Sequence, residues 1–118
     1  MSNRDELRSA ILGAAPKFAK EEVEVNGKVF EVRQPTNKAR RDLFKQAVDD
    51  SGKIDMLEFL IWAVIYNTYD PKSGEKVFED TDYDVFANMP AGGMLDKLGE
   101  AASKLLNVEA DIEKKSEN

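Results

Sequence analysis

The chain has no cysteine and no histidine. Without cysteine it cannot form disulfide bonds, use a thiolate nucleophile or bind zinc through sulfur. Without histidine it lacks the side chain that most often moves protons near neutral pH, and also the commonest metal ligand. The usual hydrolase triads therefore cannot be built, and we expect a protein without catalytic residues, cofactor or bound metal.

Long apolar runs and an excess of positive charge are also missing. The longest apolar run, residues 59–66, is far shorter than the roughly 20 residues that span a bilayer. The first eight residues include four charged ones and no apolar stretch, which argues against a signal peptide. The net charge of −6 disfavours nucleic-acid binding, because neutralising phosphates dominates such affinity. We expect a soluble cytoplasmic protein that binds neither membrane nor nucleic acid.

The hydrophobic pattern predicts an α+β fold: a mainly helical single domain with an N-terminal β-hairpin packed on a helical core. A length of 118 residues suits one domain. In the hairpin, residues 21–34, valines alternate with charged residues around Asn26-Gly27, a pair that accepts the positive φ angles of a type I′ turn. One face of the hairpin must pack on helices, because a lone hairpin is marginally stable.

Helical patterns occupy most of the remaining chain. Residues 1–20 form a predicted N-terminal helical segment with a thin apolar stripe, which needs docking to be stable. A helical region at 36–112 opens with Thr36 as the N-cap of a helix over 37–48. The next helix, 54–69, is apolar nearly all round, which is typical of a helix enclosed by the rest of the domain.

The C-terminal third predicts two more helices and a tail. Thr81 and Asp84 are spaced as a cap for a short helix. Pro90 is expected at the first position of a long helix that reaches Ile112. Residues 113–118 are expected to form a flexible tail.

The predicted turn between the helices at 37–48 and 54–69 resembles a metal-binding loop. Residues 47–58 match an EF-hand at positions 3, 5, 6, 8, 9 and 12, which hold Asp49, Ser51, Gly52, Ile54, Asp55 and Glu58. Position 1 is Ala47, where the pattern needs a calcium-binding Asp. This degenerate loop leaves calcium binding as the alternative function, and a plain turn between two helices as the simpler explanation.

Charges of opposite sign gather in two segments. Residues 33–45 have five cations and one acid, and residues 70–84 have six acids and two lysines. Arg40 is expected to face solvent with the other cations of its helix. Two such faces suit self-association or a charged partner. Solvated helix faces explain the same pattern.

The last predicted helix carries an apolar seam with alternating spacings of four and three residues. Gly99, inside this helix, costs about 1 kcal/mol relative to Ala and suggests a close helix crossing. Most of the seam fits an intramolecular core, and its distal part, 105–112, is a candidate contact for a partner. The candidate partner-binding residues are Leu98, Leu105, Leu106, Val108 and Ile112.

From the hairpin to the C-terminus, the order of segments resembles the siphophage tail assembly chaperone family. The likeness rests on a hairpin ending in Val32-Arg33, a helix that opens with residues 38–42, and an apolar helix after it. An acidic run from Phe78 then leads into Met-Pro-Ala-Gly at 89–92. The first twenty residues depart from the family's common pattern.

The resemblance implies a non-enzymatic chaperone for phage tail morphogenesis. Members of this family are thought to bind the tape measure protein and keep its long hydrophobic helices soluble while tail tube protein subunits assemble around it. They act in the host cell cytoplasm and are absent from the mature virion. Many are made in two lengths by programmed frameshifting, and Lys114-Lys115 could be encoded by the adenine-rich codons that such a shift uses.

Overall fold

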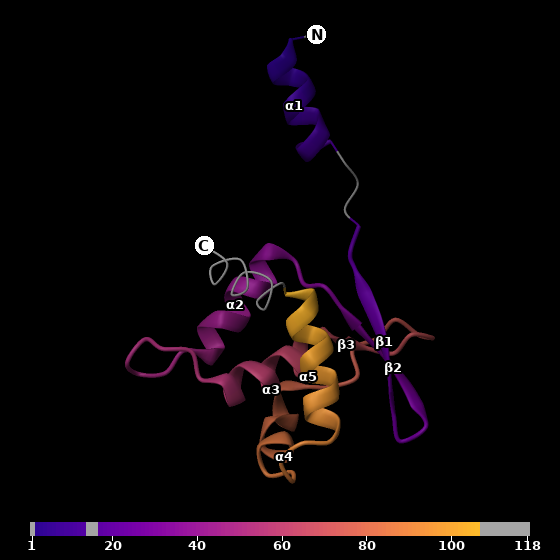
Figure 1. Cartoon of the computed structure of the whole chain (residues 1–118), viewed down its shortest axis with the longest axis vertical. Helices are drawn as coiled ribbons and strands as arrows, with labels where there is room; N and C mark the ends of the chain where they lie inside the picture. Colours follow the sequence, from indigo (N-terminus) through magenta and orange to yellow (C-terminus); the bar gives the residue numbers. More distant parts are fainter. Residues whose placement is uncertain (1, 14–16, 107–118) are drawn as a thin grey trace, which may run out of the picture.

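The computed structural model describes residues 2–13 and 17–106, and Figure 1 shows the arrangement of its helices and strands. The α+β prediction is confirmed, since helices dominate and a small antiparallel sheet packs beside them. In chain order the elements are α1 (Asn3–Leu12), β1 (Lys20–Val25), β2 (Lys28–Arg33), α2 (Asn37–Ala47), α3 (Met56–Asn67), β3 (Thr68–Tyr69), the short 3₁₀ helix η1 (Asp80–Asp82), α4 (Tyr83–Ala87) and α5 (Met94–Leu105).

The predicted hairpin is present as β1 and β2. Asn26 and Gly27 have φ angles of 53° and 76°, as the type I′ turn requires. Val25 and Val32 are buried in the core, whereas Val29 on the opposite face is 49% exposed. The hairpin therefore packs on the helices through one face.

The predicted C-terminal end of the apolar helix is wrong, because a third strand begins before it. The prediction extended this helix to residue 69, but α3 ends at Asn67 and the next two residues form β3. Thr68 pairs with Val32, and Tyr69 pairs with Glu31, so the sheet has the order β1-β2-β3. Pairing with β2 redirects the chain out of the helix at this point.

The core is centred on α3, as its composition predicts. Phe59, Ile61, Val64 and Ile65 of this helix are at most 1% exposed. Helices α2 and α5 both pack against α3, and α5 also contacts β1 and β2. Gly99 is buried on α5, which confirms the prediction of a close helix crossing at that residue.

Two predicted helix starts are corrected. The capping box in this region belongs to η1, where the Glu79 amide donates to the Asp82 carboxylate at 2.8 Å, and it does not involve Thr81 with Asp84. Pro90 does not begin the last helix, because residues 92 and 93 are glycines with φ angles of 88° and 70°, and α5 starts after them. Helix α5 ends at Leu105, and the predicted continuation to residue 112 lies outside the described residues.

Helix α1 has a capped N-terminus, but none of its side chains is buried against the rest of the protein. The Ser2 hydroxyl accepts a hydrogen bond from the Asp5 amide at 3.2 Å and caps the helix. None of its side chains is buried, and Leu7 and Ile11 are 61% and 77% exposed. In Figure 1 the helix projects beyond the body of the fold. The docking that we expected for this segment is therefore not found among the described residues.

Candidate docking groove

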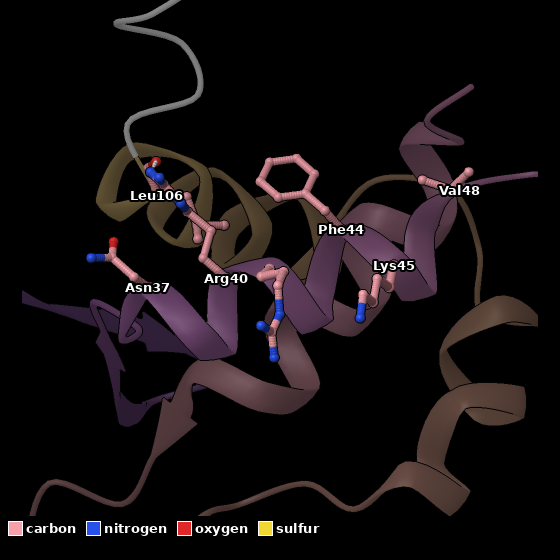
Figure 2. Close-up of a pocket in the computed structure, with 7 residues that line it drawn as sticks. Asn37, Arg40, Phe44, Lys45, Val48 and Leu106 are labelled. Atoms are coloured by element: carbon pink, nitrogen blue, oxygen red, sulfur yellow. Dashed lines mark hydrogen bonds between the residues drawn. The ribbon is translucent and has the colours of Figure 1, made fainter. Parts of the chain in front are cut away.

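An open groove of about 480 Å³ runs along α2 beside the C-terminal end of α5 (Figure 2). Its floor is apolar and its edge is basic. The residues that line it are Asn37, Arg40, Arg41, Phe44, Lys45, Val48 and Leu106. Such a combination suits an apolar segment that carries acidic side chains.

The sequence of α2 builds the groove through its helical repeat. Residues four apart share one face of a helix, so Arg40, Phe44 and Val48 stand in a row while Leu43 and Ala47 face the core. Val48 is the C-cap of the helix and is 43% exposed. The row leaves an apolar surface open along the helix.

Phe44 connects the floor of the groove to the hydrophobic core. Its ring is half-buried and lies 5.5 Å from the ring of Phe59, which belongs to the core helix α3. A ring held in this way loses little rotational freedom when another side chain packs on its open face. The groove is therefore pre-formed at its centre.

Arg40 was predicted to face solvent, but this prediction is wrong. Its Nη1 donates a hydrogen bond to the backbone carbonyl of Leu106 at 3.4 Å, and the residue is half-buried. The last carbonyls of a helix have no partner within the helix and carry the negative end of its dipole, so they attract a guanidinium group. Arg40 thereby joins α2 to the end of α5 and closes one end of the groove.

The remaining edge is positive and solvent-exposed. Arg41 and Lys45 are exposed, and Arg41 forms a surface ion pair with Asp42 at 3.3 Å. Pairs of this kind are weak in water, so the guanidinium stays available to another carboxylate.

The candidate partner-binding residues divide into three groups. Leu98 and Leu106 are 0% and 1% exposed, so they belong to the core and, contrary to our expectation, offer almost no surface to a partner. Leu105 is half-buried on α5 and packs against the core. Val108 and Ile112 lie outside the described residues. The alternating seam thus identified core positions more than contact positions.

The EF-hand-like segment forms a short turn closed by its own hydrogen bonds. Asp49 Oδ1 accepts from the Ser51 amide at 2.9 Å, the Ser51 hydroxyl at 2.6 Å and the Lys53 amide at 3.0 Å. These bonds, that of the Ser51 hydroxyl first, lower the pKa of Asp49. A β-bridge between Val48 and Ile54 closes the turn.

Two further carboxylates of that segment, Asp55 and Glu58, also have internal partners. Asp55 Oδ1 accepts from the amides of Leu57 and Glu58 and caps α3. Glu58 accepts from the Trp62 indole at 3.2 Å and from the Tyr83 hydroxyl. Across residues 2–13 and 17–106, no three acidic side chains lie where they could hold one metal ion. Asp49, Asp55 and Glu58 therefore all accept hydrogen bonds from the protein itself.

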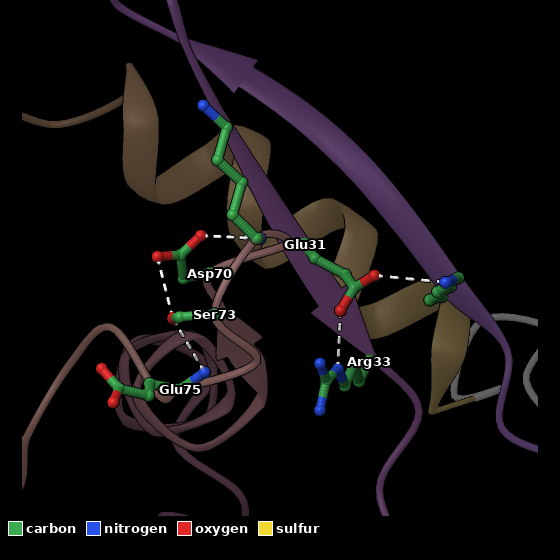
Figure 3. Close-up of polar contacts among 7 residues, drawn as sticks. Glu31, Arg33, Asp70, Ser73 and Glu75 are labelled. Atoms are coloured by element: carbon green, nitrogen blue, oxygen red, sulfur yellow. Dashed lines mark hydrogen bonds and ion pairs between the residues drawn. The ribbon is translucent and has the colours of Figure 1, made fainter.

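A buried carboxylate lies on the outer face of the sheet, where the alternating pattern predicts an exposed one (Figure 3). Glu31 is 5% exposed, accepts from Arg33 Nε at 2.7 Å and pairs with Lys20 at 3.5 Å. The Arg33 hydrogen bond is the main cause that lowers the pKa of Glu31. Arg33 also stacks on the ring of Tyr69, 4.1 Å from its centroid. The cluster joins all three strands.

A second cavity, of about 580 Å³, lies next to this cluster. Tyr66, Tyr69 and Asn67 line it together with the paired side chains of Glu31 and Arg33. The cations of this cavity, Lys20 and Arg33, are already paired with the buried Glu31, whereas Lys45 of the groove along α2 is exposed and Arg41 has only a weak surface pair. For this reason we take the groove as the candidate docking site.

Comparison with known proteins adds no assignment to this geometry. No protein-family model matches the chain, and no curated protein or solved structure shows significant similarity to it. Among the described residues, no helix combines the length and apolar character needed to cross a bilayer.

Proposed function

We propose that this protein is a non-enzymatic tail assembly chaperone of a siphophage. In this role it binds the tape measure protein and helps to recruit tail tube protein subunits in the host cell cytoplasm, and it is absent from the mature virion. The proposal is supported by the order of sequence segments and by the groove along α2.

The groove is the observation that carries the proposal. Amphipathic helices bind to other proteins by laying an apolar stripe into a groove, with charged residues at its edges. Phe44 and Val48 supply an apolar floor, while Arg41 and Lys45 supply charges that orient an acidic flank. A long helical protein exposes many such stripes before it is enclosed by other subunits.

Co-expression with the tape measure protein of the same phage tests the proposal. The measurement is the fraction of tape measure protein that stays in the supernatant after lysis. We expect the wild-type chain to raise this fraction, and Val48→Asp to remove the effect by placing a charge in the apolar floor. Val29→Asp is the matched control, because Val29 is similarly exposed but lies on the outer face of the hairpin.

These outcomes distinguish failure of the proposed chaperone function from failure of the groove as its binding site. A wild-type chain that leaves the tape measure protein insoluble contradicts the chaperone function. If the wild-type chain and Val48→Asp keep it soluble equally well, the function stands and the groove is not the contact.

A second experiment tests the longer product that the family resemblance implies. The native gene is expressed with several hundred downstream bases and an N-terminal tag, and the products are separated by immunoblot. We expect a longer band that disappears when the codons of Lys114-Lys115 are synonymously recoded. A single band before recoding contradicts frameshifting at this position.

A further inference from the structure

The second cavity, of about 580 Å³, has a buried polar side chain in its wall that the fold leaves without a partner. Asn67 lines this cavity and is 4% exposed, and its Nδ2 donates to no acceptor among the residues that the structure describes. A buried amide group without a hydrogen bond is costly and rare in native proteins. The place of Asn67 in the cavity wall points to an acceptor oxygen that a ligand supplies.

The register of the sheet places Arg33 beside Asn67. Val32 of β2 pairs with Thr68 of β3, and Arg33 follows Val32 while Asn67 precedes Thr68. Successive residues of a strand point to opposite faces, and Val32 and Thr68 are both buried toward the core. Arg33 and Asn67 both line the cavity on the other face. Two hydrogen-bond donors from neighbouring chain segments therefore meet at one site.

The charged groups of the cavity leave an excess of positive charge. Glu31 carries one negative charge, and two cations pair with it, Lys20 at 3.5 Å and Arg33 at 2.7 Å. Glu31 is the only acid among the described residues that line the cavity. Arg33 uses its Nε for Glu31, so the two Nη groups of its guanidinium are left for another acceptor. Asp70, which is also drawn in Figure 3, accepts its hydrogen bonds within its own loop.

The N-terminus of α2 adds to this positive field. Thr36 and Ala39 line the cavity, and the Thr36 hydroxyl caps the helix by accepting from the Ala39 amide at 3.0 Å. The first amides of a helix have no partner within the helix, and they carry the positive end of its dipole. Helix N-termini therefore favour anions. Together with Arg33 and Asn67, the helix favours an acceptor that carries a negative charge.

Aromatic rings and prolines form a large part of the remaining wall. The rings of Phe18, Tyr66 and Tyr69 line the cavity, together with Pro35 and Pro71. Phe18 is 52% exposed, so its ring has open surface that a ligand can cover. Small-molecule sites have volumes of about 300 to 1,000 Å³ and combine apolar walls with a few polar groups. The cavity has this size and this combination.

We propose that this cavity binds a carboxylate attached to an apolar group. The carboxylate accepts hydrogen bonds from Asn67 Nδ2 and the Arg33 guanidinium, and the apolar group packs on Phe18 and Tyr66. A carboxylate has the planar pair of oxygens that a guanidinium binds through two parallel hydrogen bonds. Free organic acids and the C-terminal residues of polypeptides both supply this chemistry. The site goes beyond the proposed function and does not depend on it, because the described lining of the cavity shares no residue with the groove along α2.

NMR titration of the ¹⁵N-labelled full chain tests the proposal. The probe is phenylacetate, and its control is phenylacetamide, which has nearly the same shape without the charge. We expect phenylacetate to cause saturable shifts at the Asn67 side-chain amide and at the backbone amides of Tyr66 and Tyr69. Phenylacetamide should bind about tenfold more weakly, because hydrogen bonds to a charged group are stronger. No saturable shift at the Asn67 side chain, or equal affinity for the two probes, overturns the proposal.

Three variants test the donors. Asn67→Leu removes the amide at similar volume, and Thr68→Val removes the neighbouring unpartnered hydroxyl, which does not line the cavity. We expect Asn67→Leu to weaken phenylacetate binding about tenfold and Thr68→Val to leave it unchanged. Arg33→Gln should also weaken it about tenfold, and this variant tests the site even if Asn67→Leu does not fold. Unchanged affinity in a folded Asn67→Leu chain or in Arg33→Gln overturns the proposal, and the amide spectrum shows whether each chain is folded.

A short peptide that ends in phenylalanine distinguishes the two sources of the carboxylate. Tighter binding of this peptide than of N-acetylphenylalanine identifies a polypeptide C-terminus as the ligand, and weaker binding identifies a free organic acid. The same peptide with an amidated C-terminus should bind about tenfold more weakly, and equal binding overturns the proposal. Val48→Asp, which tests the groove, should bind phenylacetate as the wild-type chain does. Because no tape measure protein is present, none of these outcomes bears on the chaperone function.

Discussion

Gly99 of α5 lies directly against Leu60 of α3, and a Cβ atom at Gly99 would come within 2.8 Å of Leu60 Cδ2. Real Cβ atoms do not approach another carbon this closely, so the two helices cross at this distance because residue 99 has no side chain. Both helices carry buried core residues on either side of the crossing. The crossing therefore fixes how α5 sits on the rest of the core.

Gly99→Ala should destabilise the protein although alanine favours helix. The helix gains about 1 kcal/mol in propensity, but overpacking a core costs about 1 to 3 kcal/mol. Urea unfolding should show a net loss, and in a Leu60→Ala background the same substitution should become stabilising. A Gly99→Ala effect of the same sign and size in both backgrounds would show that Leu60 does not cause it.

Glu31→Gln should remove part of the acid sensitivity of the fold. The folded-state pKa of Glu31 lies below its usual value of 4.5, chiefly because of the Arg33 hydrogen bond. A lowered folded pKa means that the contribution to stability is fully present above pH 4.5 and is lost as the pH falls through the folded pKa. Urea midpoints measured from pH 7 down to acid should fall less steeply in the variant. Glu24→Gln, an exposed change on β1, is the control and should leave the slope unchanged.

Tyr83→Phe should change how the stability and the tyrosinate absorbance of the protein depend on pH in the alkaline range. The hydrogen bond to Glu58 is the main cause that raises the pKa of Tyr83 to about 12 from 10.0. The raised pKa means that the contribution to stability is present below pH 10 and is lost as the pH rises toward 12. Absorbance of tyrosinate should show a component that titrates near pH 12 and disappears in the variant. A component near pH 12 that persists in the variant would contradict the Glu58 contact.

Thr68→Val should stabilise the protein. Thr68 is 0% exposed, and its hydroxyl has no hydrogen-bond partner among the residues described. Valine has the same shape and suits a strand, so the substitution removes an unsatisfied polar group at little steric cost. We expect a gain of about 1 kcal/mol in the free energy of unfolding. Thr81→Val, at an exposed position, should change it little, and a loss at position 68 would show that the hydroxyl is satisfied after all.

Features set by neighbouring residues were predictable from the sequence. Asn26-Gly27 determines its turn through backbone conformations that few other residues accept, and the hairpin follows from it. Thr36 was predictable as a cap because its hydroxyl bonds to the amide of Ala39, three residues away. In both cases the partner lies within the same short segment.

Features set by distant contacts were not predictable. Thr68 and Tyr69 continue an apolar helical pattern, and only the pairing with β2 makes them a strand. The candidate site depended on such contacts even more. Arg40 reaches a carbonyl 66 residues away, and the burial of Leu98 depends on how α5 crosses α3. A helical seam shows which residues are apolar, but not which of them the rest of the fold covers.

The strand order leaves β1 at an edge of the sheet, with no strand on its other side among the described residues. Four of its six residues are charged, namely Lys20, Glu21, Glu22 and Glu24. Charges on an open edge discourage the edge-to-edge pairing that starts aggregation. Replacing Glu22 and Glu24 with threonine should keep the hairpin intact but make concentrated solutions scatter light as sheets extend from one molecule to the next. The charged residues of β1 therefore protect this edge of the sheet from pairing with another molecule.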